Sequence, residues 1–112
     1  MARYLTFGAN KDGNHEDIRD VYKCYNIKTK TVTTVAGFAD LVVSTSLITD
    51  VVEIKLPGRL GLTKLEQVFQ ANWPKKVPII ATYEDAREHI ASIWHRHNLL
   101  DAALKEAPQR TK

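Results

Sequence analysis

The sequence predicts a mixed α/β fold whose elements follow the order helix, three strands, helix, strand, helix. Three observations predict it. Apolar residues recur at helical spacing near both ends of the chain, short runs rich in Val, Ile and Thr lie between them, and a helix-start pattern separates the third run from the fourth. At 112 residues the chain predicts one domain, with residues 1–14 as an N-terminal extension and residues 107–112 as a loose polar tail.

The composition narrows the class of protein. It is 44% hydrophobic and 26% charged, which is ordinary for a globular domain. Sixteen Lys and Arg against thirteen Asp and Glu give a net charge of +3, which is compatible with a nucleic-acid partner. The single cysteine excludes an internal disulfide and suits a reducing compartment. With no signal peptide and no apolar run near the ~18 residues of a membrane span, we expect a soluble, cytoplasmic protein without membrane contact.

The first helix is expected over residues 15–25. A turn is expected over residues 10–14, and Asn14 is a suitable helix cap. The apolar stripe of this helix is Ile18, Val21, Tyr22 and Tyr25. The β-prone composition of residues 21–27 favours a strand instead, and of the two interpretations we prefer the helix.

Three strands are expected next, over residues 27–35, 40–44 and 50–56. A turn separates the first two, and a Pro-Gly pair ends the third. Because side chains alternate between the two faces of a strand, Val52 and Ile54 should point into the core. Glu53 and Lys55 should then point together to the opposite face.

The C-terminal half carries two helices and one strand. Thr63 and Glu66 form a capping box, and Leu65, Val68 and Phe69 lie on one side of the helix that it opens. A buried strand is expected over residues 77–81, followed by a helix that either extends to about residue 106 or is broken at Asn98. The apolar face of the last helix is Tyr83, Ala86, Ile90, Ile93, Trp94 and His97, continued by Leu100 and Leu104.

Three charged residues form the candidate site. Asp40 opens the second strand, and Glu53 and Lys55 lie side by side on the third. Carboxylate oxygens are the ligands that Mg²⁺ prefers, and an ammonium group beside them can orient water or stabilise negative charge. This combination is what a metal-dependent phosphodiesterase needs, provided that the three groups meet around a pocket open to solvent.

The chain resembles the restriction-endonuclease-like nucleases, whose signature is written PD…(D/E)xK. Within that superfamily it is most similar to the small stand-alone VRR-NUC nucleases, which are widespread in phages. The likeness covers roughly residues 15–95, and archaeal-type Holliday-junction resolvases share the same core. Ala39 stands where the family usually has Pro. The matching residues are Gly37 to Val43, Val52 to Gly58, Gln67, and Val77 to Ile80.

The resemblance implies a restriction-endonuclease-like αβββαβα core with a mixed central sheet flanked by helices. It also implies a homodimeric endonuclease that uses Mg²⁺ or Mn²⁺ and acts on branched or structured DNA. Asp40, Glu53 and Lys55 would be catalytic. The metal ligands would be Asp40, Glu53, the carbonyl of Ile54 and an acid of the first helix, for which Glu16 is the candidate and Asp17 and Asp20 are competitors.

Binding to DNA requires contacts with phosphate groups. The expected nucleic-acid contacts are Lys28, Lys30, Arg59, Lys64, Gln67, Lys75 and Lys76. The alternative function is a catalytically inactive module of the same fold that binds DNA or protein, for example a phage regulator. The three histidines of the last helix, His89, His95 and His97, face three directions and therefore cannot share one zinc ion.

Overall fold

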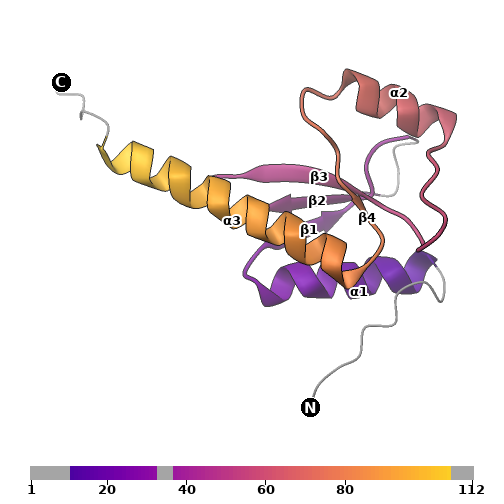
Figure 1. Ribbon diagram of the computed structural model, residues 1–112, viewed down its shortest axis with the longest axis horizontal. Coiled ribbons are helices and arrows are strands. Elements are labelled where there is room, and N and C mark those ends of the chain that lie inside the picture. The colour runs from indigo at the N-terminus through magenta and orange to yellow at the C-terminus, as the bar shows by residue number, and fades with distance from the viewer. Residues whose placement is uncertain (1–10, 33–36, 107–112) are drawn as a thin grey trace, which may run out of the picture.

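The computed structural model describes residues 11–32 and 37–106, with side chains from residue 14 onward (Figure 1). The elements follow the predicted order, so the mixed α/β class is confirmed. Most of the predicted N-terminal extension and the whole predicted tail lie outside the described residues. The elements are α1 (Lys11–Cys24), β1 (Lys28–Thr31), β2 (Leu41–Ser44), β3 (Thr49–Ile54), α2 (Lys64–Asn72), β4 (Ile79–Ile80) and α3 (Tyr83–Glu106).

The four strands form one mixed sheet in the order β1-β2-β3-β4. β2 runs antiparallel to both β1 and β3, and β4 lies parallel to β3. A parallel neighbour requires a crossover, and α2 lies within that connection between β3 and β4. The expected strand over residues 77–81 is shorter than predicted, since only Ile79–Ile80 pair as a strand.

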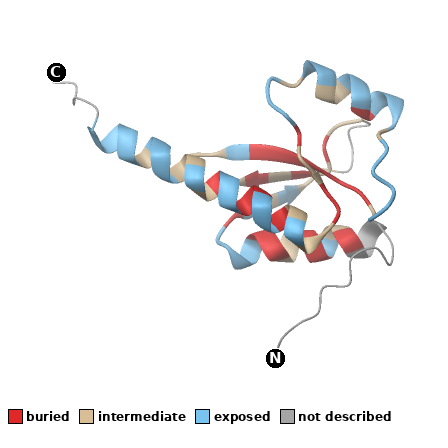
Figure 2. Cartoon of the chain, in the orientation of Figure 1, coloured by how far each residue is buried: buried red, intermediate tan, exposed pale blue. Residues whose placement is uncertain are grey.

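Helices cover both faces of the sheet, as Figures 1 and 2 show. Ile18 and Tyr22 of α1 and Ile93 of α3 pack with Val52 and Ile54 in the main buried cluster. A smaller cluster on the opposite face joins Val51 to Phe69 of α2. Adjacent residues of β3 therefore enter different clusters, which is the alternation expected of a strand with both faces covered.

The start of α1 corrects a prediction. The helix begins at Lys11, within the residues expected to form a turn, and Asn14 lies inside it instead of capping it. The Asn14 side chain is fully buried and its Nδ2 donates to the carbonyl of Lys55, 2.8 Å away. A long-range contact of this kind outweighs the weak helix propensity of Gly and Asn nearby. The alternative strand over residues 21–27 is not adopted, because α1 continues to Cys24 and β1 begins at Lys28.

The position of α2 depends on Gly37. Gly37 has a φ of +79°, and a Cβ at this position would lie 2.6 Å from the Cβ of Leu65. Only glycine allows α2 to approach the entry to β2 so closely. On the apolar side predicted for α2, Phe69 packs against Phe38 and Trp73. Leu65 and Val68 are 58% and 55% exposed.

The last helix, α3, is 24 residues long, as the sequence predicts. Ala86, Ile90 and Ile93 are buried against the sheet. The second half extends beyond the sheet (Figure 1), which leaves Leu100 and Leu104 39% and 55% exposed. Among the helices in the described part of the chain, none combines the length and the apolar character that crossing a bilayer requires.

Candidate functional site

Two hydrogen bonds to β3 position Asp40, which directly precedes β2. Leu41 is the register partner of Val52, and the amide of Asp40 donates to the Val52 carbonyl at 3.0 Å. The Oδ2 of Asp40 in turn accepts from the backbone amide of Ile54 at 2.8 Å. Since the N–H and C=O of one strand residue point to the same side, the Ile54 carbonyl faces the Asp40 side of β3.

Glu53 is the most buried acidic group of the site. It is 1% exposed, and its Oε1 has no hydrogen-bond partner among the described residues. Burial, a hydrogen bond with Glu66 and the negative charge of Asp40 raise the pKa of Glu53 to about 9. The carboxyl group therefore holds a proton at neutral pH in the absence of a cation.

Lys55 is held by an acid that the sequence analysis did not place at the site. Its Nζ donates to Oε1 of Glu66 at 2.6 Å, and both side chains are about nine-tenths buried. Glu66 is also the N3 residue of the α2 capping box, in which its Oε1 accepts from the Thr63 amide at 2.8 Å. Burial raises the pKa of Glu66, but hydrogen bonds from Glu53 and Lys55 outweigh it and lower the pKa to about 2.

The structure brings a different part of α1 to the site than we predicted. Asn14 contacts the Lys55 carbonyl, and Nε2 of His15 lies 4.0 Å from Oδ1 of Asp40. Glu16, the predicted metal ligand, is exposed. Glu16 comes two residues after Asn14, which is a rotation of about 200° around the helix axis. Glu16 therefore faces away from the side on which Asn14 contacts β3. Of the two competitors, Asp17 is buried and Asp20 is half-buried.

The charges of Asp40 and Lys55 both act on Glu53, but the site is more closed than the solvent-open pocket that we expected. The Asp40 side chain is 15% exposed, and Lys55 is 8% exposed beneath the start of α2. Within the described ranges, no three or more side chains of His, Cys, Asp or Glu are arranged to hold a metal ion. Glu66 is already engaged by Lys55 and Thr63. The remaining oxygen donors are the carboxylates of Asp40 and Glu53, with the Ile54 carbonyl on the Asp40 side.

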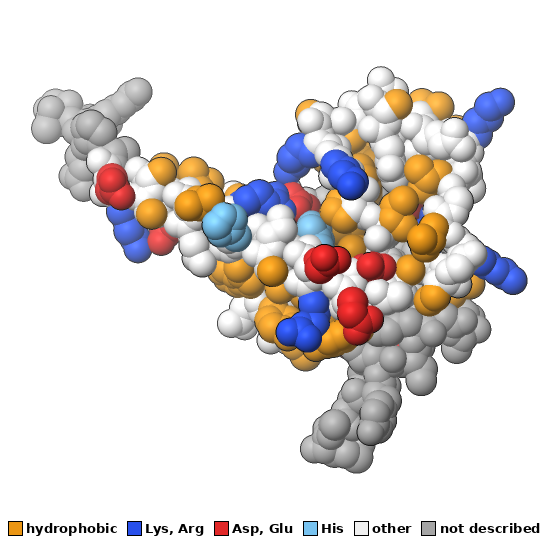
Figure 3. All heavy atoms as spheres, in the orientation of Figure 1, with side chains coloured by type: hydrophobic (Ala, Val, Ile, Leu, Met, Phe, Trp, Pro, Cys, Tyr) orange, Lys and Arg blue, Asp and Glu red, His pale blue; other side chains and the backbone are white. Residues whose placement is uncertain are grey.

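The predicted nucleic-acid contacts are all exposed. Gln67 donates from Nε2 to the Leu62 carbonyl at 3.1 Å, and its neighbour Glu66 is the residue that reaches the site. Lys28 and Lys30 share one face of the edge strand β1. On the face drawn in Figure 3, basic side chains lie at separate points and gather only where α3 meets the segment leading to β4.

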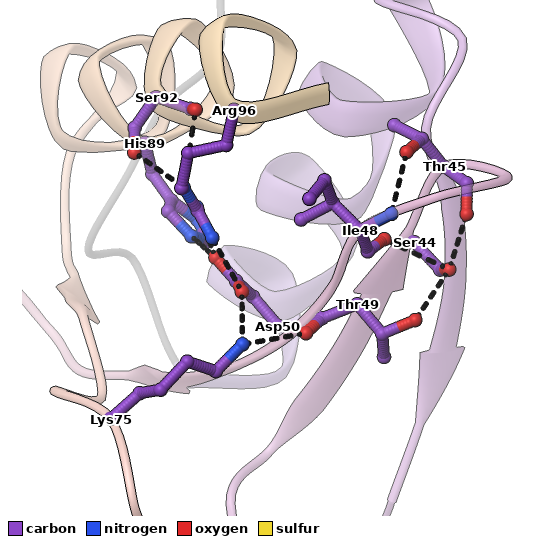
Figure 4. A network of polar contacts seen from close by, with 9 residues as sticks. All are labelled: Ser44, Thr45, Ile48, Thr49, Asp50, Lys75, His89, Ser92 and Arg96. Atoms are coloured by element: carbon purple, nitrogen blue, oxygen red, sulfur yellow. Dashed lines mark hydrogen bonds and ion pairs between the residues drawn. The ribbon is translucent and has the colours of Figure 1, made fainter. Parts of the chain in front are cut away.

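A second polar network, centred on Asp50, was not predicted from the sequence (Figure 4). Asp50 is 6% exposed and accepts two hydrogen bonds from Arg96, at 3.0 and 2.6 Å. It also accepts from Nε2 of His89 at 2.7 Å and from Nζ of Lys75 at 3.0 Å. Burial raises the pKa of Asp50, but these hydrogen bonds outweigh it and hold the pKa well below the usual range for Asp.

The network continues through His89 to α1. The Oη of Tyr22 lies 2.6 Å from Nδ1 of His89, and Tyr22 is fully buried. Because the Asp50 carboxylate only accepts, His89 carries its proton on Nε2. In the neutral imidazole, Tyr22 then donates to Nδ1, which agrees with the burial that raises the pKa of the Tyr22 hydroxyl.

The other two histidines of α3 lie apart from His89, as the helical positions predict. The Nδ1 of His97 is 2.7 Å from Oγ1 of Thr45, and its ring contacts Trp94. His95 is exposed. The three side chains therefore do not converge on one point.

Comparison of the chain with protein-family models, with curated proteins and with solved structures found no match.

Proposed function

We propose that this protein is a metal-dependent DNA endonuclease of restriction-endonuclease-like fold, in which Asp40, Glu53 and Lys55 are the catalytic residues. The observation that supports it best is the pairing of two acids at the end of β3. Oε1 of Glu53 is buried without a hydrogen-bond partner among the described residues, and the charge of Asp40 contributes to the high pKa of Glu53. A divalent cation would give the buried Oε1 a partner and remove the repulsion from Asp40, because it replaces the proton and neutralises the two carboxylates.

The donor set fits Mg²⁺ or Mn²⁺. Both are hard cations that take oxygen ligands, and Mg²⁺ keeps several waters, so two carboxylates suffice. Asp40 and Glu53 would hold the ion, together with the Ile54 carbonyl. When bound, the ion supplies Lewis-acid activation of water and of the phosphate. We retain Glu16 as the predicted acid of α1 only as part of the resemblance, because it faces away from Asn14.

Lys55 and Glu66 have separate roles in this proposal. The Lys55 ammonium orients the attacking water or stabilises the charge that develops on the phosphate. Glu66, from α2, accepts a hydrogen bond from Nζ of Lys55 at 2.6 Å and so holds the ammonium group in place. It is also hydrogen-bonded to Glu53. Admission of the substrate therefore requires the start of α2 to move away from β3.

The substrate, assembly and location follow from the resemblance. We propose branched or structured DNA as the substrate, contacted by the exposed basic residues, and a homodimer in the cytoplasm, that of the bacterial host if the gene is carried by a phage. The apolar stripe of α3 that extends beyond the sheet supports self-association, since Leu100 and Leu104 are 39% and 55% exposed. Sedimentation equilibrium tests the dimer directly.

Cleavage assays test the activity. Linear duplex, single-stranded and four-way-junction DNA are incubated with the protein and Mg²⁺ or Mn²⁺, and with chelator alone. We expect metal-dependent cleavage by the wild type and by Glu106→Gln, an exposed control with the same charge change, and loss of cleavage in Glu53→Gln. Absence of metal-dependent cleavage on every substrate contradicts the proposal.

The second candidate is a non-catalytic binding module of the same fold. The burial of Glu53 and the closed Lys55–Glu66 pair favour it, because a purely structural network needs no access to substrate. This candidate predicts DNA or protein binding that is insensitive to Glu53→Gln and to metal. The cleavage assay and a binding assay on the same variants distinguish the two functions.

A further inference from the structure

The segment before β4 and helix α3 enclose a groove of about 250 Å³ that the proposed nuclease site does not use. Its lining includes Lys75, Lys76, His89, Ser92 and Arg96, with Asp50 at its base. By strand alternation Asp50 and Glu53 point to opposite faces of β3, so this groove is separate from the candidate active site.

The groove carries more positive than negative charge. Three cationic side chains, Lys75, Lys76 and Arg96, line the groove together with the single carboxylate of Asp50. Asp50 neutralises only one of them, and the Lys75 and Arg96 side chains are 51% and 35% exposed. Such an excess of cations in a concave surface attracts anions.

Asp50 also holds two of these cations in fixed positions. Arg96 donates through Nη1 and Nη2 to Asp50 and through Nε to Ser92, and each Nη carries a second hydrogen that can reach a ligand. Lys75 donates to Asp50 and to the Thr49 carbonyl and has a third hydrogen. A guanidinium group and two ammonium groups around one hollow are the donors that recognise phosphate.

We propose that this groove is a binding site for a phosphate group, contacted by Arg96, Lys75 and Lys76. We place the phosphate beside Arg96 and Ser92, which do not line the adjoining hollow of about 300 Å³. Asp85 and Glu88 line that hollow together with Lys76, and the two carboxylates repel a phosphate. The source of the phosphate is either the backbone of a nucleic acid or a small phosphorylated molecule. The inference shares Lys75 and Lys76 with the DNA contacts of the proposed nuclease, but it involves none of the catalytic residues Asp40, Glu53 and Lys55.

Salt dependence of DNA binding tests the nucleic-acid source. Binding of a labelled duplex is measured by fluorescence anisotropy across a NaCl series, in chelator so that no cleavage occurs. Each phosphate contact contributes about 0.9 to the slope of log K against log salt. We expect Lys76→Gln and Lys75→Gln each to lower the slope by about that amount, and Lys105→Gln, an exposed control on the outer end of α3, to leave it unchanged. Lys76→Gln is the safer variant because Lys76 is exposed and donates none of the four hydrogen bonds that Asp50 accepts from side chains.

A second measurement distinguishes a small phosphorylated ligand. Inorganic phosphate alone is titrated while the NMR signal of the Arg96 Nε–H is followed in the wild type and in Lys76→Gln. A saturable shift that the variant weakens, together with unchanged DNA slopes, supports a phosphate site that serves small molecules. The proposal is contradicted if Lys75→Gln and Lys76→Gln have the same salt slope for DNA binding as Lys105→Gln and if inorganic phosphate shifts no Arg96 signal.

Discussion

Asp50 shows how one residue joins parts of the chain that the sequence keeps far apart. Its carboxylate links β3 to α3 through His89 and Arg96, and His89 links α3 to Tyr22 of α1. Buried carboxylates are tolerated only when cations and hydrogen bonds compensate for the lost water, and here four hydrogen bonds do so. Removing the carboxylate charge therefore weakens the hydrogen bonds from the buried His89 and from the partly exposed Arg96 and Lys75.

We predict that Asp50→Asn lowers the free energy of unfolding at pH 7 by about 2–3 kcal/mol, since the partial exposure of Arg96 and Lys75 screens part of the interaction. The folded pKa lies below the unfolded value of about 3.9, so the stabilisation is present above that pH and is lost as the pH falls. Urea unfolding at pH 7 and at pH 3 measures both effects. The control Asp101→Asn removes an exposed i,i+4 pair and should cost about 0–1 kcal/mol; an equal effect of the two variants contradicts the account.

Glu53 makes stability depend on pH in the opposite direction to Asp50. Its folded pKa of about 9 lies above the unfolded value of about 4.3, so the folded state keeps a proton that the unfolded state loses. Without metal, wild-type stability should therefore fall relative to Glu53→Gln as the pH rises from 5 to 8, by up to about 1.4 kcal/mol per pH unit. Urea unfolding in chelator at both pH values checks this. A difference between the two proteins that stays constant with pH shows that Glu53 is ionised in the folded state.

The alternation of side chains along β3 made part of the candidate site predictable from single residues. The sequence predicts that Glu53 and Lys55 share a face opposite to Val52 and Ile54, and the two buried clusters agree. The burial of Glu53 and Lys55 was not predictable, because it depends on Glu66, which the sequence presents only as the N3 residue of a capping box.

In α2, one residue, Glu66, takes part both in the helix cap and in a contact with β3. Its capping box was predicted from Thr63 and Glu66 and is present, with the Glu66 amide donating to Oγ1 of Thr63 at 3.2 Å. The same Glu66 carboxylate holds Lys55. Any loss of the cap should therefore loosen the helix start that covers the candidate site.

We predict that Thr63→Ala lowers the free energy of unfolding by about 1 kcal/mol, because the Glu66 amide loses its acceptor. Thr63→Ser is the matched control, since serine keeps the hydroxyl group and should remain close to wild type. Chemical unfolding of the three proteins measures the difference. If alanine and serine behave alike, the cap does not stabilise α2.

The ends of the elements were harder to predict than their order. The start of α1 was wrong because the composition around Gly13 and Asn14 is typical of turns, whereas the burial of Asn14 against Lys55 is visible only once β3 is in place. The apolar side predicted for α2 is exposed at Leu65 and Val68, because amphipathic spacing identifies a face without showing whether another element covers it.

At the scale of the whole molecule, both polar sites depend on contacts between distant segments. Asp40 reaches Ile54 across 14 residues, Lys55 reaches Glu66 across 11, and Asp50 reaches His89 across 39. The first two pairs lie close to a recognisable strand and helix start, so the region was predictable. The Asp50–His89 pair has no local pattern, and only the packing of α3 on the sheet brings it together.

Calorimetric titration of Mn²⁺ into the metal-free protein at neutral pH, in two buffers of different ionisation enthalpy, tests the central claim that a divalent cation replaces the proton on Glu53 beside Asp40. We predict that the wild type and Glu106→Gln bind the ion and release about one proton, and that Glu53→Gln binds far more weakly and releases none. Failure of the wild type to bind Mn²⁺ or Mg²⁺, or equal binding by Glu53→Gln, contradicts the claim.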